Sequence, residues 1–118
     1  MIELNDPSLL RQSALIDGQW VPAGSGKTLD VTNPATGLSI GTVPDMDELD
    51  TRAAIDAANA AYAGWKSKTA AERAERLEAW HALMLAHIDD LAVILTLEQG
   101  KPLSEARGEI AYGASFVK

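Results

Sequence analysis

Apolar and polar residues alternate along this chain with two different periods. Over residues 13–44 the alternation repeats about every second position, which is the period of a half-buried β-strand. The dipeptide Asp17-Gly18 supplies the positive φ angles that a two-residue hairpin turn requires, and Asn33–Gly37 provides a second turn. We therefore predict two β-hairpins. Their expected strands are residues 13–16, 19–21, 28–32 and 38–43.

In the rest of the chain the apolar residues recur about every 3.6 positions, as on one face of an α-helix. Asp47 is a favourable N-cap for the first helix, and Thr69 with Glu72 forms a capping box that begins a second. A third helix is expected to end at Gly100. Pro102 suits the first turn of a fourth helix, because its missing N–H would be unpaired there in any case. The pattern predicts four helices packed as an antiparallel bundle.

The order of these elements determines the predicted fold class. Strands joined by tight turns come first and helices follow in a block, which indicates an α+β fold and not a parallel sheet. We divide the chain into an amino-terminal arm (1–12), a β-hairpin region (13–44) and a helical part (45–118). The last helical pattern reaches Lys118 without a glycine, proline or cap, so we expect the chain to be truncated at its carboxyl end.

Charge and composition exclude several classes of function. The 118 residues carry a net charge of −7, and the ten Lys and Arg residues are spread through the chain. Binding to nucleic acid or anionic lipid requires clustered basic residues. No apolar run approaches the roughly 20 residues that span a bilayer, and the amino terminus has no signal-peptide pattern. We predict a cytoplasmic protein that binds neither nucleic acid nor membrane.

The inventory of reactive side chains is equally restrictive. The sequence contains no cysteine and two histidines. Without cysteine there is no thiolate nucleophile, disulfide or cysteine-based metal site. His81 and His87 are six positions apart, and not the four that a helical zinc pair usually takes. We assign these histidines no role.

The segment Gly24-Ser25-Gly26-Lys27-Thr28 superficially resembles a phosphate-binding loop. That loop requires a glycine five positions before the Gly of Gly-Lys-Thr, where this chain has Val21. It also requires a helix behind it, whose N-terminus faces the phosphates. A strand is expected there instead, so we interpret the segment as a linker between strands.

Several landmarks along the chain carry a family resemblance. They are Leu15–Trp20, Val31–Gly37, Gly41–Pro44, Ala53–Ala58, Trp65, Arg73, Leu97–Pro102 and Glu105–Phe116. In this order and at this spacing they resemble the amino-terminal end of the aldehyde dehydrogenase superfamily, and within it most closely the succinate-semialdehyde dehydrogenases. The resemblance implies that the hairpins and helices belong to the α/β fold of that superfamily, with residues 45–118 in its nucleotide-binding domain.

The resemblance also implies a larger enzyme. Family members are several-fold longer, and they oxidise an aldehyde through a cysteine thiolate, hydride transfer to NAD(P)+ and hydrolysis of the resulting thioester by a glutamate and water. Those residues do not lie in this chain, which alone is expected to be inactive. NADP or NAD would be bound by parts absent from it. The implied full-length protein is a homo-oligomer acting on succinate semialdehyde, with glutarate semialdehyde or another aldehyde as the alternative substrate.

By resemblance, two pairs of residues take functional positions. Glu109 and Gly113, on the fourth helix, would border the substrate tunnel, although this helix is rich in small residues that also suit plain close packing. An acidic Glu109 would repel a carboxylated aldehyde unless arginines elsewhere outweigh it. Thr32 and Glu98 fall where some relatives hold a monovalent cation through backbone carbonyls and an acidic side chain.

A second hypothesis belongs to a different class of function. The chain would be a self-contained helical interaction module without catalysis, which predicts a cooperative, monomeric fold. The enzyme-segment hypothesis predicts exposed apolar faces and aggregation or a molten state when the chain is isolated.

Overall fold

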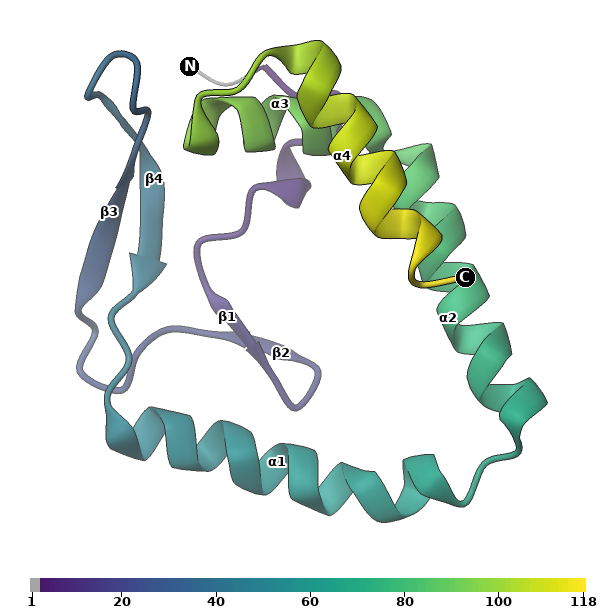
Figure 1. Ribbon diagram of the computed structural model, residues 1–118. Coiled ribbons are helices and arrows are strands. Elements are labelled where there is room, and N and C mark those ends of the chain that lie inside the picture. The colour runs from purple at the N-terminus through teal and green to yellow at the C-terminus, as the bar shows by residue number, and fades with distance from the viewer. Residues whose placement is uncertain (1–2) are drawn as a thin grey trace.

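Two antiparallel hairpins and four helices make up the computed structural model, which describes residues 3–118 (Figure 1). The order of elements confirms the predicted α+β class. In chain order they are η1 (Pro7–Leu9), β1 (Ala14–Ile16), β2 (Gln19–Val21), β3 (Thr28–Thr32), β4 (Ser39–Pro44), α1 (Glu48–Lys66), α2 (Ala70–Ala86), α3 (Ile88–Gln99) and α4 (Leu103–Ser115).

The first hairpin pairs β1 with β2, with Leu15 opposite Trp20. Its turn residues Asp17 and Gly18 have φ angles of 52° and 72°, as a two-residue turn that follows the twist of the strands requires. The predicted hairpin is confirmed. Asp17 is the one described non-glycine residue with a positive φ.

The second hairpin pairs β3 with β4, with a register irregularity between Val31 and Thr32. The side-chain oxygen of Asn33 accepts a hydrogen bond from the N–H of Ala35 at 2.9 Å, which stabilises the turn locally. The predicted hairpin is again confirmed. Because of the irregularity, Thr32 lies opposite Ser39 at the end of the ladder.

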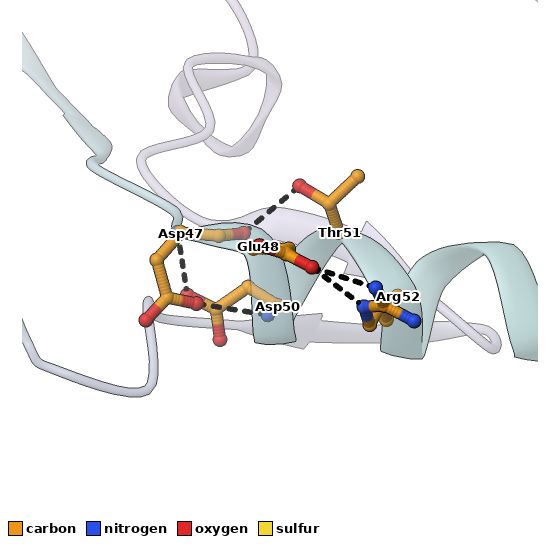
Figure 2. Close-up of polar contacts among 5 residues, drawn as sticks. All are labelled: Asp47, Glu48, Asp50, Thr51 and Arg52. Carbon is orange, nitrogen blue, oxygen red and sulfur yellow. Dashed lines mark hydrogen bonds and ion pairs between the residues drawn. The ribbon is translucent and has the colours of Figure 1, made fainter.

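The amino terminus of α1 is fixed by a reciprocal cap (Figure 2). The carboxylate of Asp47 accepts from the N–H of Asp50 at 3.0 Å, and the carboxylate of Asp50 accepts from the N–H of Asp47 at 3.1 Å. Such a cap contributes about 1 kcal/mol. The other carboxylate oxygen of Asp50 accepts from the N–H of Gly24 at 3.0 Å. Asp50 therefore also attaches the loop between the two hairpins to α1.

Helices α2, α3 and α4 pack together, while α1 extends away from them along the first hairpin (Figure 1). Of the four helices expected to form an antiparallel bundle, α2, α3 and α4 contact one another, whereas α1 contacts β1. The imidazole Nδ1 of His81 on α2 donates to the carbonyl oxygen of Ala114 on α4 at 2.7 Å. In the described part of the chain no single helix is long and apolar enough to cross a membrane; α2 and α3 reach that composition only together, across a 72° bend.

The helices approach one another through small residues. The apolar residues buried within residues 3–118 are Ala23, Ala92, Ala106 and Ala114. No large apolar side chain in that range is fully buried, and sixteen are exposed, including Trp20, Trp65 and Trp80. Exposed large apolar side chains in this number are suited to contact with further protein.

Asp90 anchors the amino-terminal arm to α3. Its carboxylate, 4% exposed, accepts from the backbone N–H groups of Asn5 and Asp6 at 2.8 Å each and from the Asn5 side-chain amide at 3.1 Å. The N–H groups of Asn5 and then Asp6 lower the pKa of Asp90. These bonds hold the described residues Asn5 and Asp6 of the arm against α3; Met1 and Ile2 lie outside the described residues.

We expect the Asp90→Asn substitution to release the amino-terminal arm from α3. The substitution is made in the full-length protein that contains this segment. The asparagine amide would direct its own donor at the N–H of Asp6, so one bond is replaced by repulsion between two donors. Amide hydrogen exchange of a peptide covering residues 3–9 should accelerate about tenfold. Because the pKa of Asp90 is lowered in the folded state, the wild-type bonds persist at neutral pH and are lost only as the pH falls through that lowered pKa.

The matched control is Asp56→Asn, which makes the same change at an exposed position of α1. Exchange near the arm should not change in this variant. Equal exchange in wild type and Asp90→Asn would show that the carboxylate does not hold the arm.

Candidate functional site

The outer face of α4 carries the two residues that resemblance assigns to the substrate tunnel. Glu109, Tyr112, Gly113 and Phe116 are spaced i, i+3, i+4 and i+7, so they share one side of the helix. Tyr112 and Phe116 are 66% and 72% exposed, and their rings meet edge to face with centroids 4.8 Å apart. A Cβ atom at Gly113 would have no neighbour within 4 Å. This face is therefore open at Gly113, whereas Ala114, which is buried and accepts a hydrogen bond from His81 of α2, marks the packed side.

The charge of Glu109 is compensated by Lys101. The Nζ atom of Lys101, in the connection between α3 and α4, forms an ion pair with a carboxylate oxygen of Glu109. The lysine side chain is 20% exposed and the glutamate 48%. A second ion pair, between Arg107 and Asp89, joins α4 to the start of α3. The outer face of α4 thus presents a neutral charge pair beside an aromatic pair.

The structure brings Glu98 toward the second hairpin. Glu98, near the end of α3, lines a cavity of about 20 Å³ together with Val31, Gly41 and the guanidinium-bearing Arg11. That volume is enough for one water molecule or small ion. Thr32 does not line the cavity, although its neighbour Val31 does. The cavity thus contains Glu98 together with the positively charged Arg11, which disfavours a cation there, and Thr32 is not part of its lining.

The loop that superficially resembled a phosphate-binding loop does not fit a nucleotide cofactor. Residues 24–27 join β2 to β3, so a strand follows where a phosphate site needs the N-terminus of a helix. Lys27 accepts, through its carbonyl oxygen, a backbone bond from Asp45 at 2.8 Å, which closes the base of the second hairpin. The segment is a structural connection.

Two larger hollows are open and mainly apolar. One, of about 440 Å³, lies between α3 and α4 beside the Arg107–Asp89 ion pair. The other, of about 410 Å³, lies between the turn of the second hairpin and Leu97 on α3. Within residues 3–118 no three His, Asp or Glu side chains are grouped so as to hold a metal ion, and the chain has no cysteine. These surfaces can contact a ligand or another segment, but they contain no thiolate.

Three residues of this face, Lys101, Tyr112 and Phe116, were not expected from the sequence. Tyr112 and Phe116 were treated as part of the helical pattern. Tyr112 follows Glu109 by three positions and Phe116 follows Tyr112 by four, and this spacing could have shown that the three residues share one side of the helix. Lys101 was treated as part of the break between helices. Its pairing with Glu109 depends on the conformation of the connection, which no periodicity reveals. The positions of Glu109 and Gly113 at a tunnel, and of Thr32 and Glu98 at a cation, stay predictions.

Comparison with known proteins adds independent findings. Three curated relatives are the NADP(+) succinate-semialdehyde dehydrogenase GabD of Escherichia coli K12 (56% identical over 117 residues), a 3-sulfolactaldehyde dehydrogenase of Pseudomonas putida (56% over 118) and a glutarate-semialdehyde dehydrogenase of P. putida KT2440 (53% over 117). The alignments cover 99%, 100% and 99% of this chain and 24% of each relative. The chain therefore spans about a quarter of their length.

The fold is shared with solved structures. The crystal structure of succinate-semialdehyde dehydrogenase from Burkholderia pseudomallei superposes with a TM-score of 0.94 at 59% identity, over 96% of this chain and 23% of that one. The family model described as "Aldehyde dehydrogenase family" matches residues 20–118 of the sequence. Because that match spans most of the sequence, the chain belongs to the aldehyde dehydrogenase family.

Proposed function

We propose that the chain is the amino-terminal segment of an NAD(P)-dependent aldehyde dehydrogenase that oxidises succinate semialdehyde to succinate. The observation that carries this proposal is the 56% identity with a succinate-semialdehyde dehydrogenase across almost the whole chain. The three relatives named above act, by their names, on aldehydes that bear a carboxylate or a sulfonate. An anionic aldehyde is thus the substrate class, and glutarate semialdehyde is the alternative within it.

In this proposal the segment supports catalysis without performing it. The thiolate chemistry of the family needs a cysteine, and this chain has none. Its part is to supply helices 45–118 to the nucleotide-binding domain and to border the substrate tunnel with Glu109 and Gly113. The open outer face of α4 supports that assignment. The cofactor, NADP or NAD, is held by other segments of the enzyme, since the Gly24–Thr28 connection does not fit it.

The same proposal includes a cellular setting. The enzyme is cytoplasmic and a homo-oligomer, and its small-molecule partner is the aldehyde. The net charge of −7 and the dispersed basic residues argue against nucleic acid as a partner. The sixteen exposed large apolar side chains supply surface for contacts with other segments or subunits.

Steady-state kinetics of the complete enzyme test the substrate. We expect kcat/KM for succinate semialdehyde to exceed that for glutarate semialdehyde by about tenfold, which is the usual effect of one methylene. Butanal has the same four-carbon chain without the carboxylate and should be poorer still, because the groups that pair with the carboxylate are left without a partner. Both NAD+ and NADP+ are tested. The highest kcat/KM for butanal would contradict the proposal.

The isolated segment 1–118 tests the alternative of a self-contained interaction module. With large apolar side chains exposed along α1 and α2, we expect it to bind a hydrophobic dye and to associate or unfold without a sharp thermal transition. A cooperative transition in a monomeric sample would instead favour the module hypothesis.

The cation site proposed at Glu98 and Thr32 is tested by replacing K+ and Na+ with choline. We expect the melting temperature of the complete enzyme to fall by a few degrees, since a bound ion stabilises the folded state by mass action. Glu98→Gln should lower it in K+ and remove the dependence on the ion. Glu75→Gln, at an exposed position of α2, is the control. The same melting temperature in both salts would contradict the site.

A further inference from the structure

The turn of the first hairpin contains the pair Asp17-Gly18, and no other aspartate of the sequence precedes a glycine. Both residues are exposed, with φ angles of 52° and 72°. The Asp17 carboxylate takes part in none of the three ion pairs within residues 3–118. By contrast, backbone N–H groups hold several other carboxylates by hydrogen bonds, among them those of Asp6, Asp47 and Asp90. The Asp17 carboxylate is therefore exposed beside the backbone nitrogen of Gly18.

An aspartate isomerises when the next backbone nitrogen attacks its side-chain carboxyl carbon. The N–Cγ bond forms, the carboxyl hydroxyl and the amide proton leave as water, and a five-membered cyclic imide results. Water then adds at the main-chain carbonyl carbon and breaks its bond to the nitrogen, which leaves isoaspartate with a free main-chain carboxylate. One water is lost and one is regained, so the mass is unchanged and nothing is oxidised or reduced.

The geometry of this turn suits the imide. The ring holds ψ of Asp17 near its value at the first central position of a type II′ turn, where φ is positive as it is at Asp17. Type II′ is, with type I′, a favoured two-residue hairpin turn. Gly18 would change the sign of its φ, which glycine does without steric cost, and even a Cβ atom there would have no neighbour within 4 Å. The imide can therefore form while the two strands stay paired.

The neighbouring helix leaves room for the ring. Asp17 and Gly18 line an open hollow of about 310 Å³, and its other wall consists of alanines of α1, including Ala54 and Ala58. Alanine side chains carry no hydrogen-bond donor. The wall that faces the turn therefore has no side chain that would hold the Asp17 carboxylate away from the Gly18 nitrogen.

We propose that Asp17 is a site of spontaneous covalent modification, at which the Gly18 nitrogen closes the imide and hydrolysis leaves isoaspartate. The modification is independent of the reaction that the complete enzyme catalyses. Isoaspartate adds one main-chain carbon between the paired residues Ile16 and Gln19, so the turn of the hairpin becomes longer.

The test keeps the complete enzyme at physiological temperature and neutral pH for several weeks and then digests it with trypsin. Cleavage after Arg11 and Lys27 releases residues 12–27, in which Asp17 is the one acidic residue. An isoaspartyl methyltransferase should transfer a labelled methyl group from S-adenosylmethionine to this peptide, and electron-transfer fragmentation should place isoaspartate at position 17. The control is the tryptic peptide 28–52, whose four aspartates precede residues other than glycine. We expect about tenfold less isoaspartate there, which corresponds to a barrier higher by ~1.4 kcal/mol.

Two variants change the group that closes the ring and leave Gly18 in place. Asp17→Asn should react faster, because at neutral pH an uncharged amide carbon is a better electrophile than a carboxylate, and loss of ammonia gives the mass change of deamidation. Asparagine is also favoured at this turn position, so the hairpin is retained. In Asp17→Glu the ring would need six members, and residues 12–27 should accept no methyl group above background. Asp56→Asn, which precedes Ala57 on α1, is the matched control and should stay intact over the same period.

A synthetic peptide of residues 12–27 serves as the unfolded reference. If this peptide isomerises but the complete enzyme does not, the folded turn or its neighbours protect Asp17 and the inference is wrong. Isoaspartate spread equally over the two tryptic peptides would also overturn it, as would an Asp17→Asn variant that stays undeamidated for as long as Asp56→Asn.

Discussion

The arrangement of this segment depends on the backbone at Gly100. Its φ of 85° ends α3 in a left-handed conformation, and its N–H donates to the carbonyl oxygen of Thr96 at 2.8 Å. A side chain would be strained there, and a Cβ atom would lie 3.0 Å from Cγ of Pro34 in the turn of the second hairpin. Glycine thus permits two things at once: the reversal into α4, and the contact between the hairpin and the end of α3. The position of Lys101, one residue on, follows from the same break.

The reversal brings α3 and α4 together through alanines. Ala92, Ala106 and Ala114 are buried, and a helix interface of such small residues allows close approach but removes little apolar area from water. The large residues point elsewhere: Trp80 on α2 and Trp65 on α1 are 56% and 39% exposed. The tight contacts therefore set the relative positions of the helices, while much of the hydrophobic driving force available to these residues requires surfaces beyond them.

Interactions within a few residues could be predicted from the sequence. The Asp17-Gly18 turn and the cap of α2 by Thr69 and Glu72 involve groups at most three positions apart, so residue type and spacing determine them. The anchoring of the arm could not be predicted in this way. Asn5 and Asp90 are separated by 85 positions, and the donors are mainly backbone N–H groups that every residue but proline possesses.

The candidate site likewise combines features that local sequence predicts with contacts that it does not predict. Glu109 and Gly113 were singled out by resemblance, and helical periodicity then fixes that they share a face. Lys101 was missed because its contact with Glu109 joins the connection between α3 and α4 to the middle of α4. The packing of Pro34 against the same turn, which reaches across 66 residues of chain, is likewise absent from any local pattern.

The net charge of −7 on this segment opposes the binding of anionic aldehydes that we propose for the enzyme. Screening resolves the difficulty, because at physiological ionic strength exposed charges farther away than about 8 Å contribute little. Local pairing then decides the potential that a ligand meets. On α4 the ion pairs Lys101–Glu109 and Arg107–Asp89 cancel charge within the structure itself, while Glu48 on α1 is paired with Arg52 by bonds of 2.7 and 2.9 Å (Figure 2). The ion pairs therefore lower the local charge without removing it, because Glu105, four residues before Glu109 on α4, is exposed and takes part in none of the three ion pairs formed within residues 3–118.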